Sequence, residues 1–129
     1  MTPQPENNHP PGSPGYWKAM WEQALYLHGL HGNVTLHSKH PQEPPEGYIR
    51  LGYAENYGDD AQGPNCFYIQ PSWIGGLRDS PESQDEGGRY WMWWREPERR
   101  GENSAHIDAE SYVLAQAHYY QKPRQLSLL

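Results

Sequence analysis

Apolar residues recur at helical spacing in the first quarter of the chain. From Trp17 to His28 they stand three or four positions apart, which places them on one face of an α-helix. Ser13 is a favourable N-cap, and Pro14 suits the first helical position because an N–H has no intrahelical partner there. Glycines at positions 29 and 32 are typical of a helix end. We therefore predict a helix that begins at Pro14 and ends near Gly32.

A second helix is predicted near the end of the chain, over residues 109–120. Asp108 is a favourable N-cap. Ile107 and Tyr112 stand at the two positions that form a hydrophobic staple around such a cap. Pro123 cannot continue a helix. The residues after Pro123 are therefore expected to leave the helix and project from it.

Four segments between these helices are predicted to be strands, because they combine β-branched and aromatic residues in short runs. The last segment is the strongest, since its aromatic residues alternate onto both faces. Loops rich in Gly, Asp, Ser or Pro are predicted over residues 55–65 and 75–88. The predicted strands are residues 34–37, 48–53, 66–70 and 89–95.

Short connections between strands favour antiparallel pairing, because a parallel crossover needs a dozen or more residues. We therefore predict an α+β fold with a small, four-stranded, mainly antiparallel sheet, flanked by an N-terminal and a C-terminal helix. Residues 1–13 are polar and proline-dense and are expected to form a disordered arm. Residues 14–121 are expected to form a single α+β domain, and residues 122–129 a tail that carries a linear motif.

Composition adds that aromatic rings must build the core. Hydrophobic residues make up only 35% of the 129 residues, but six Trp and ten Tyr are present, and each large ring removes about 150–250 Å² from water. The net charge of -6 disfavours a duplex-DNA binder that neutralises phosphates. Cys66 is the single cysteine, which excludes an internal disulfide. We recognise no signal peptide or long apolar segment, so we expect a cytoplasmic protein without a membrane partner.

The tail is unusual because a solvated chain end is normally polar. Its last five residues include three leucines, and each would release roughly 1.5–3 kcal/mol if it were buried in a pocket. This pentapeptide resembles the linear motif by which bacterial polymerases, mismatch-repair proteins and replication regulators bind the sliding clamp. The residues that carry the resemblance are Gln125, Leu126, Ser127, Leu128 and Leu129.

The resemblance implies a role for each of these positions. Gln125, Leu128 and Leu129 match the main anchors of the clamp-binding family, although the family favours Phe at the last position. Leu126 would add an apolar contact, and Ser127 would support an extended backbone. The resemblance thus implies an adaptor or inhibitor that binds the sliding clamp (the beta subunit of DNA polymerase III) in DNA replication or repair. The alternative is a small protein-interaction domain, anti-defence or regulatory, whose tail packs on its own fold. We recognise no family for residues 14–121.

The aromatic strand offers a second candidate site. Trp91 and Trp93 share one face of the predicted strand, and Arg95 follows on the same face. These three residues are a candidate second interface with the partner. Their composition also resembles a base-stacking platform, so a second hypothesis is a single-stranded nucleic-acid-binding module. In the plainer interpretation both faces of the strand are packed.

Signals for catalysis and for cofactors are weak. The histidines at positions 28, 31, 37 and 40 straddle element ends and lack a supporting Cys pair or an HExxH motif, so we expect no metal site. Asp59 and Asp60 are adjacent in a predicted turn, and Asp108 is explained as a cap. No P-loop, dinucleotide fingerprint or nucleophile elbow is present. We expect a protein without cofactor or enzymatic activity, with a small metal-dependent enzyme as the remaining alternative.

Overall fold

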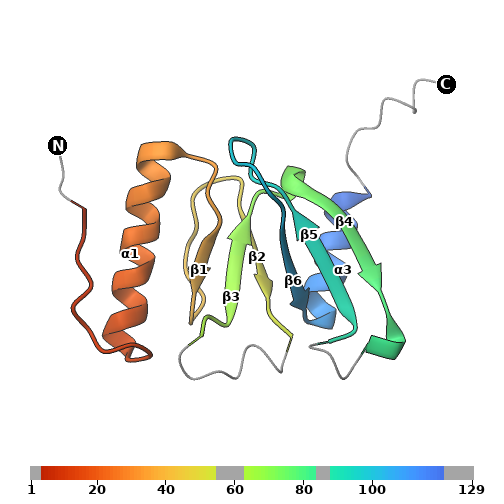
Figure 1. The fold of residues 1–129 in the computed structure, drawn as a ribbon, viewed down its shortest axis with the longest axis horizontal. Helices are drawn as coiled ribbons and strands as arrows, with labels where there is room; N and C mark the ends of the chain where they lie inside the picture. Colours follow the sequence, from red (N-terminus) through yellow and green to blue (C-terminus); the bar gives the residue numbers. More distant parts are fainter. Residues whose placement is uncertain (1–3, 55–62, 84–87, 121–129) are drawn as a thin grey trace.

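The computed structural model confirms the α+β class and describes residues 4–54, 63–83 and 88–120 (Figure 1). In these residues two α-helices accompany two three-stranded antiparallel sheets. The prediction of one four-stranded sheet is therefore wrong. The α-helices and strands are α1 (Pro14–His31), β1 (Leu36–Ser38), β2 (Ile49–Gly52), β3 (Cys66–Ile69), β4 (Ile74–Asp79), β5 (Tyr90–Trp94), β6 (Asn103–Ile107) and α3 (Ala109–Tyr119).

Both helices begin at the caps that the sequence predicts. The Ser13 hydroxyl accepts a hydrogen bond from the Tyr16 N–H at 3.2 Å. The Asp108 carboxylate accepts one from the Ser111 N–H at 2.7 Å. Helix α1 continues through His31, and Gly32 follows it with a positive φ of 63°, which a residue without Cβ adopts at little cost.

The four predicted strands all form, but they fall into two sheets. The first sheet has the order β1-β3-β2 and the second the order β4-β5-β6. The prediction omitted β4 and β6. Strand β4 lies in a segment that Gly75 and Gly76 made resemble a loop, and β6 has only two apolar residues, Ala105 and Ile107. The strand signal is weak where side chains give no apolar alternation.

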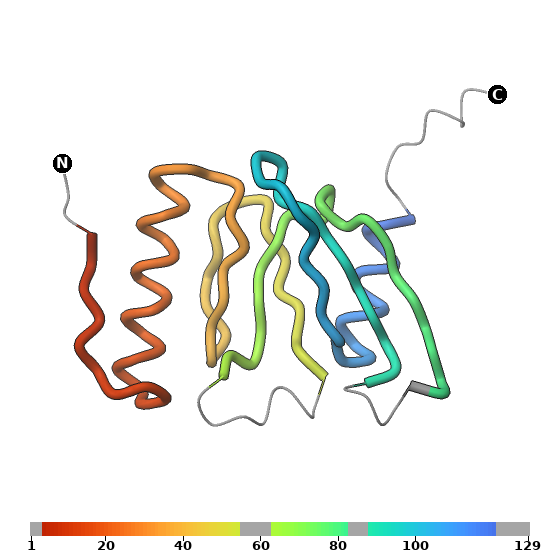
Figure 2. Tube along the Cα trace, in the orientation of Figure 1, coloured from red at the N-terminus to blue at the C-terminus, as the bar shows by residue number. Residues whose placement is uncertain are grey.

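One backbone bridge joins the two sheets in the described residues. Tyr53, just after β2, pairs with Ile107 of β6. The Ala54 N–H donates to the His106 carbonyl at 2.9 Å, and the Asp108 N–H donates to the Gly52 carbonyl at 3.0 Å. Strands β2 and β6 therefore lie side by side near the middle of the molecule, with α1 and α3 towards opposite ends (Figure 2).

Aromatic rings fill the core, as the composition predicts. Phe67 of β3 stacks on Trp94 of β5, with ring centroids 4.8 Å apart and planes at 14°. Helix α1 packs Trp21 edge-on against Tyr68 at 5.0 Å. At the second sheet, helix α3 packs Tyr112 against Tyr90, and the two rings stack with their centroids 4.5 Å apart.

A buried carboxylate fixes the segment after β5 against the first sheet. Glu96 is 7% exposed and accepts a hydrogen bond from the Thr35 N–H at 2.6 Å. The Trp94 indole N–H donates to the Thr35 hydroxyl at 3.0 Å. Two polar contacts thus converge on Thr35, and they satisfy groups that would be costly to bury alone.

Residues 4–13 run along α1 (Figure 1). The Asn7 amide donates to the Tyr16 carbonyl at 3.2 Å, and the Gln23 amide donates to the Pro5 carbonyl at 3.0 Å. The disorder expected for residues 1–13 stays a prediction for measurements in solution. Within the described residues, no helix has the apolar length that a bilayer span requires.

The stack between the sheets leads to a stability prediction. Replacing the fully buried Phe67 by Ala should lower the free energy of unfolding by about 3–5 kcal/mol, because the change removes the ring and leaves a cavity. Urea denaturation followed by far-UV circular dichroism measures the change. Val113→Ala is the control, since Val113 is 65% exposed and its loss should cost less than about 0.5 kcal/mol. Equal losses in both variants would contradict the assigned core.

Candidate functional site

The structure describes one of the two predicted sites. Residues 125–129 lie outside the described residues. Trp91 and Trp93 lie in β5, and the exposed Arg95 follows directly after it. We therefore build the candidate site from the surface of β5.

The register of the strands places six residues on one face of the β4–β5–β6 sheet. Directly paired residues of antiparallel strands share a face, and Trp91 pairs with both Arg78 and His106, whereas Trp93 pairs with Gly76 and Ser104. We call this set the outer face. It comprises Gly76, Arg78, Trp91, Trp93, Ser104 and His106.

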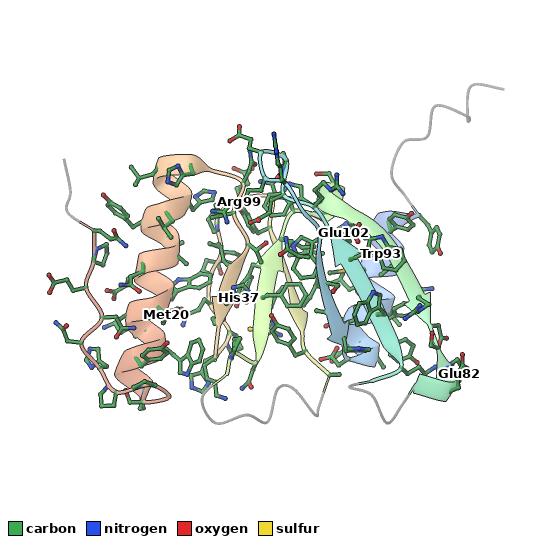
Figure 3. The ribbon with its side chains drawn as sticks, in the orientation of Figure 1. Met20, His37, Glu82, Trp93, Arg99 and Glu102 are labelled. Atoms are coloured by element: carbon green, nitrogen blue, oxygen red, sulfur yellow. The ribbon has the colours of Figure 1, made fainter. Side chains whose placement is uncertain are left out.

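The opposite face of the sheet is the core face. Met92 is fully buried, and Trp94 is 3% exposed. Tyr90 lies on this face too and stacks on Tyr112 of α3. Helix α3 therefore covers the core side, and the figure shows it behind the sheet on which Trp93 lies (Figure 3). In the part of the chain that the structure describes, no helix covers the outer face.

Trp91 is held by neighbours on both adjacent strands. The His106 ring meets it edge-on, with ring centroids 4.3 Å apart and planes at 75°. The Arg78 guanidinium carbon lies 5.8 Å from the Trp91 ring centroid, within the range of a cation–π contact. His106 is itself positioned by a 3.1 Å hydrogen bond between Nδ1 and the Gly88 carbonyl. Trp91 is thus a half-buried ring with a fixed orientation.

The Trp93 indole packs against Gly76 of the neighbouring strand β4. A Cβ atom at Gly76 would come within 2.0 Å of the Trp93 six-membered ring, and one at Gly75 within 3.3 Å of the same indole. The register between β4 and β5 shifts at this point, between Ile74 and Gly76. The two glycines therefore open the space in which the Trp93 indole lies over the strand backbone.

A cavity of about 260 Å³ opens beside Trp91. It is lined by Tyr53, Trp91, Ser104, Ala105 and His106. Aromatic rings supply its walls, and the hydroxyls of Tyr53 and Ser104 are polar groups of a kind that can orient a ligand. Burial, with a smaller contribution from the nearby Cys66, raises the pKa of Tyr53 to about 12. Tyr53 is therefore neutral at physiological pH and can donate a hydrogen bond.

Among the described residues, two arginines without an acidic partner lie at or next to the outer face. Arg78 and Arg95 form no ion pair with any described residue. The neighbouring Asp79 is paired with Arg89, and the Arg89 hydrogen bonds lower the pKa of that carboxyl. Glu102, two positions before Ser104, is an exposed carboxylate near this face.

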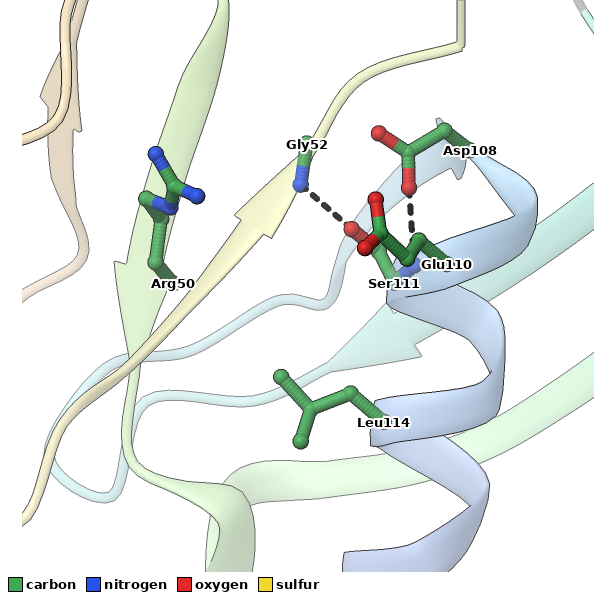
Figure 4. Close-up of a pocket in the computed structure, with 6 residues that line it drawn as sticks. All are labelled: Arg50, Gly52, Asp108, Glu110, Ser111 and Leu114. Carbon is green, nitrogen blue, oxygen red and sulfur yellow. Dashed lines mark hydrogen bonds between the residues drawn. The ribbon is translucent and has the colours of Figure 1, made fainter.

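A second cavity, of about 320 Å³, lies between β2 and the start of α3 (Figure 4). The polar groups of Gly52, Asp108 and Ser111 in its lining are already used in the fold. The Gly52 N–H donates to the Ser111 hydroxyl at 2.7 Å, and Asp108 caps the helix. A Cβ at Gly52 would approach the Asp108 carboxylate within 2.4 Å. We interpret this cavity as a gap beside the hydrogen bonds that attach the start of α3 to β2, with a structural role.

The histidines do not converge with other metal-binding side chains. His28 packs edge-on against Tyr48 at 5.5 Å, and His37 lies beside Phe67 at 6.4 Å. Burial lowers the pKa of His37, against a smaller opposing effect of Glu96. In the described part of the chain, no three His, Cys, Asp or Glu side chains gather as metal ligands would.

Cys66 belongs to a buried polar cluster in the first sheet. Its sulfur lies 3.1 Å from the Ser38 hydroxyl, and the Tyr68 hydroxyl lies 3.2 Å from the same Ser38 oxygen. The Gln42 N–H donates to the Tyr68 oxygen at 2.8 Å. These contacts satisfy one another inside the core, so the cluster has a structural role.

Comparison with known proteins does not add a relative. No family model, curated protein or solved structure matches the chain.

The tryptophans of this site are evident from the sequence, but most of their neighbours are not. Alternation in residues 89–95 identified Trp91 and Trp93. Arg78 lies in the strand that was predicted to be a loop, and His106 in the strand that was not predicted at all. Ile74 and Leu77 were the apolar residues that could have indicated β4, but the two glycines between them break the alternation.

The glycine beneath Trp93 gives a test of the outer face. Gly76→Ala should displace the Trp93 indole, change the near-UV circular dichroism of the protein, and lower the free energy of unfolding by about 1–3 kcal/mol through overpacking. Gly29→Ala is a matched control, because nothing lies within 4 Å of a Cβ there. It should stabilise helix α1 by up to about 1 kcal/mol. An unchanged tryptophan spectrum in Gly76→Ala would contradict the described packing.

Tyr53 makes stability depend on high pH. Its folded pKa, about 12, exceeds the ordinary value of 10, so the folded state holds this proton more tightly than the unfolded state. The resulting stabilisation is complete below pH 10 and is lost as the pH rises through 12, by roughly 2–3 kcal/mol in total. Urea unfolding between pH 9 and about 12 measures it. The Tyr53→Phe variant should lack this component, and coincident pH profiles for the two proteins would disprove the assignment.

Proposed function

We propose that this protein is an adaptor or regulator that docks on the bacterial sliding clamp through residues 125–129. The observation that carries the proposal is the match of these residues to the clamp-binding motif, directly after the helix-stopping Pro123. Gln125 would fix the register of the peptide through its amide. Leu128 and Leu129 would fill the apolar pocket.

The end of α3 supports this proposal. The Tyr119 hydroxyl donates to the Gly75 carbonyl at 3.3 Å, so the last turn of the helix is attached to β4. Tyr120, the last described residue, is 56% exposed. The motif therefore follows a helix end that is anchored to the domain and open to solvent.

Two consequences follow for a clamp that carries this protein. The tail would recruit the α+β domain to the clamp, and it would occupy a pocket that other clamp-binding peptides need. A single peptide of this kind binds with about micromolar affinity, which corresponds to about 8 kcal/mol. A second contact by the domain would raise the affinity through avidity.

Replacing both Leu128 and Leu129 by Ala should weaken binding to a bacterial sliding clamp at least about tenfold, since each buried leucine contributes roughly 1.5–3 kcal/mol. Isothermal titration with the purified clamp measures the affinity. Leu30→Ala is the matched control, because Leu30 is a leucine that is 57% exposed on α1. Leu30→Ala should bind like the parent chain.

A chain that ends at Arg124 separates this proposal from its alternative. Under the proposal it loses clamp binding, but it unfolds at the same urea concentration as the full chain. If the tail instead packs on its own domain, the shortened chain should be less stable. Clamp binding that is equal with and without residues 125–129 would refute the proposal, as would no binding by the full chain.

A further inference from the structure

We infer that the outer face of the β4–β5–β6 sheet binds single-stranded nucleic acid, with bases stacked on Trp91 and Trp93 and phosphates beside Arg78 and Arg95. This function is independent of clamp docking, since it uses none of the residues 125–129. It rests on four features of the face: its aromatic spacing, its cavity, its charge and its lack of aliphatic side chains.

The two indoles have the spacing of a stacking platform. They stand two residues apart on one strand, so their Cα atoms are separated by about 6.6 Å along β5. Both belong to a sheet face that none of the described helices covers, and neighbours hold each ring in place. Sheet domains that bind RNA stack two or three bases on aromatic residues in this way. Such stacking tolerates any base, because every base has a π-face.

The cavity beside Trp91 provides a position for one base at its edge. Its volume of about 260 Å³ lies just below the range of about 300–1,000 Å³ for sites of drug-sized ligands. It therefore suits one planar ring system. Trp91 and His106 wall the cavity, while the Ser104 hydroxyl can donate to or accept from the edge of a base.

The local charge suits a phosphate backbone even though the whole chain is acidic. Arg78 and Arg95 carry no acidic partner among the described residues, and Asp79 is neutralised by Arg89. Among the described residues, Glu102 is an opposing charge near the face. Two cations favour moderate affinity in which stacking outweighs electrostatics. A duplex, whose bases are already stacked on one another, cannot use this platform.

The composition of the face combines rings and cations. Apart from Gly76, its side chains are those of Arg78, Trp91, Trp93, Ser104 and His106, and none of them is aliphatic. Trp and Arg are also enriched at protein interfaces, so the binding experiments below, and not composition alone, separate the two kinds of partner. Rings and cations without aliphatic residues are the combination that single-strand binders use.

Fluorescence anisotropy of labelled oligonucleotides tests the inference on the full chain. The probes are oligothymidylate and oligouridylate of about 12 nucleotides, within the usual site size, and a duplex of equal length. The single strands should bind and quench tryptophan fluorescence, and the duplex should bind at least about tenfold more weakly. A preference for either sugar supports the inference and identifies DNA or RNA as the natural strand.

Variants localise the binding. Trp91→Ala and Trp93→Ala should each weaken it by about fivefold to a hundredfold. Gly76→Ala retains both indoles but displaces Trp93, so it should also weaken binding. Tyr120→Ala, which removes an exposed ring from α3, should have no effect.

The salt dependence tests the role of the arginines. Each phosphate contact contributes about -0.7 to the slope of log K against log salt for a single strand. Arg78→Gln should therefore make the slope shallower by about 0.7. Arg50→Gln is the control, because Arg50 is an exposed arginine of β2 in the other sheet, and it should leave the slope unchanged.

Two results would overturn the inference: no binding of either single strand by the full chain, and oligonucleotide binding that folded Trp91 and Trp93 variants retain in full. If those variants keep oligonucleotide binding but bind the clamp more weakly, the outer face is a contact with the clamp. The proposed function then stands and this inference fails. A chain that binds oligothymidylate but not the clamp would support the inference and refute the proposed function instead.

Discussion

The stack of Phe67 on Trp94 is the contact on which the arrangement of the two sheets depends. A single backbone bridge, between Tyr53 and Ile107, connects the sheets in the described residues. Stacked rings 4.8 Å apart add a side-chain contact between the sheets, beside the hydrogen bonds of Trp94 and Glu96 to Thr35. Such a pair adds about 0.5–1.5 kcal/mol beyond the burial of its area. This is how a chain with few aliphatic residues holds two small sheets together.

Strand β5 links this core to the candidate site. Its period of two residues sends Met92 and Trp94 inward and Trp91 and Trp93 outward. The buried residues therefore fix the register in which the outer rings are presented. A site built on such a strand is more rigid than one built on a loop. The two proposed activities thus differ in kind, since one uses a fixed platform and the other a linear peptide.

How far the sequence predicts this structure depends on whether the signal is local. The N-caps Ser13 and Asp108 each accept a hydrogen bond from the backbone N–H three residues later, and both helices form where expected. Strand β4 was missed because the glycines at 75 and 76 are explained only by the Trp93 ring, which is distant in sequence. For the same reason, the sequence identified the tryptophans of the outer face but not their neighbours on β4 and β6. Alternation shows which residues share a strand face, but the pairing of Trp91 with Arg78 and His106 follows from the tertiary structure.

The packing of the Trp93 ring on Gly76 also limits which substitutions this protein can accept at the two positions. A side chain at position 76 and a large ring at position 93 exclude each other sterically. Substitutions at these two positions should therefore be coupled, with any residue larger than glycine accompanied by a smaller residue opposite it. Because the two positions are far apart along the chain and adjacent in space, their covariation would serve as a marker of this sheet in divergent sequences.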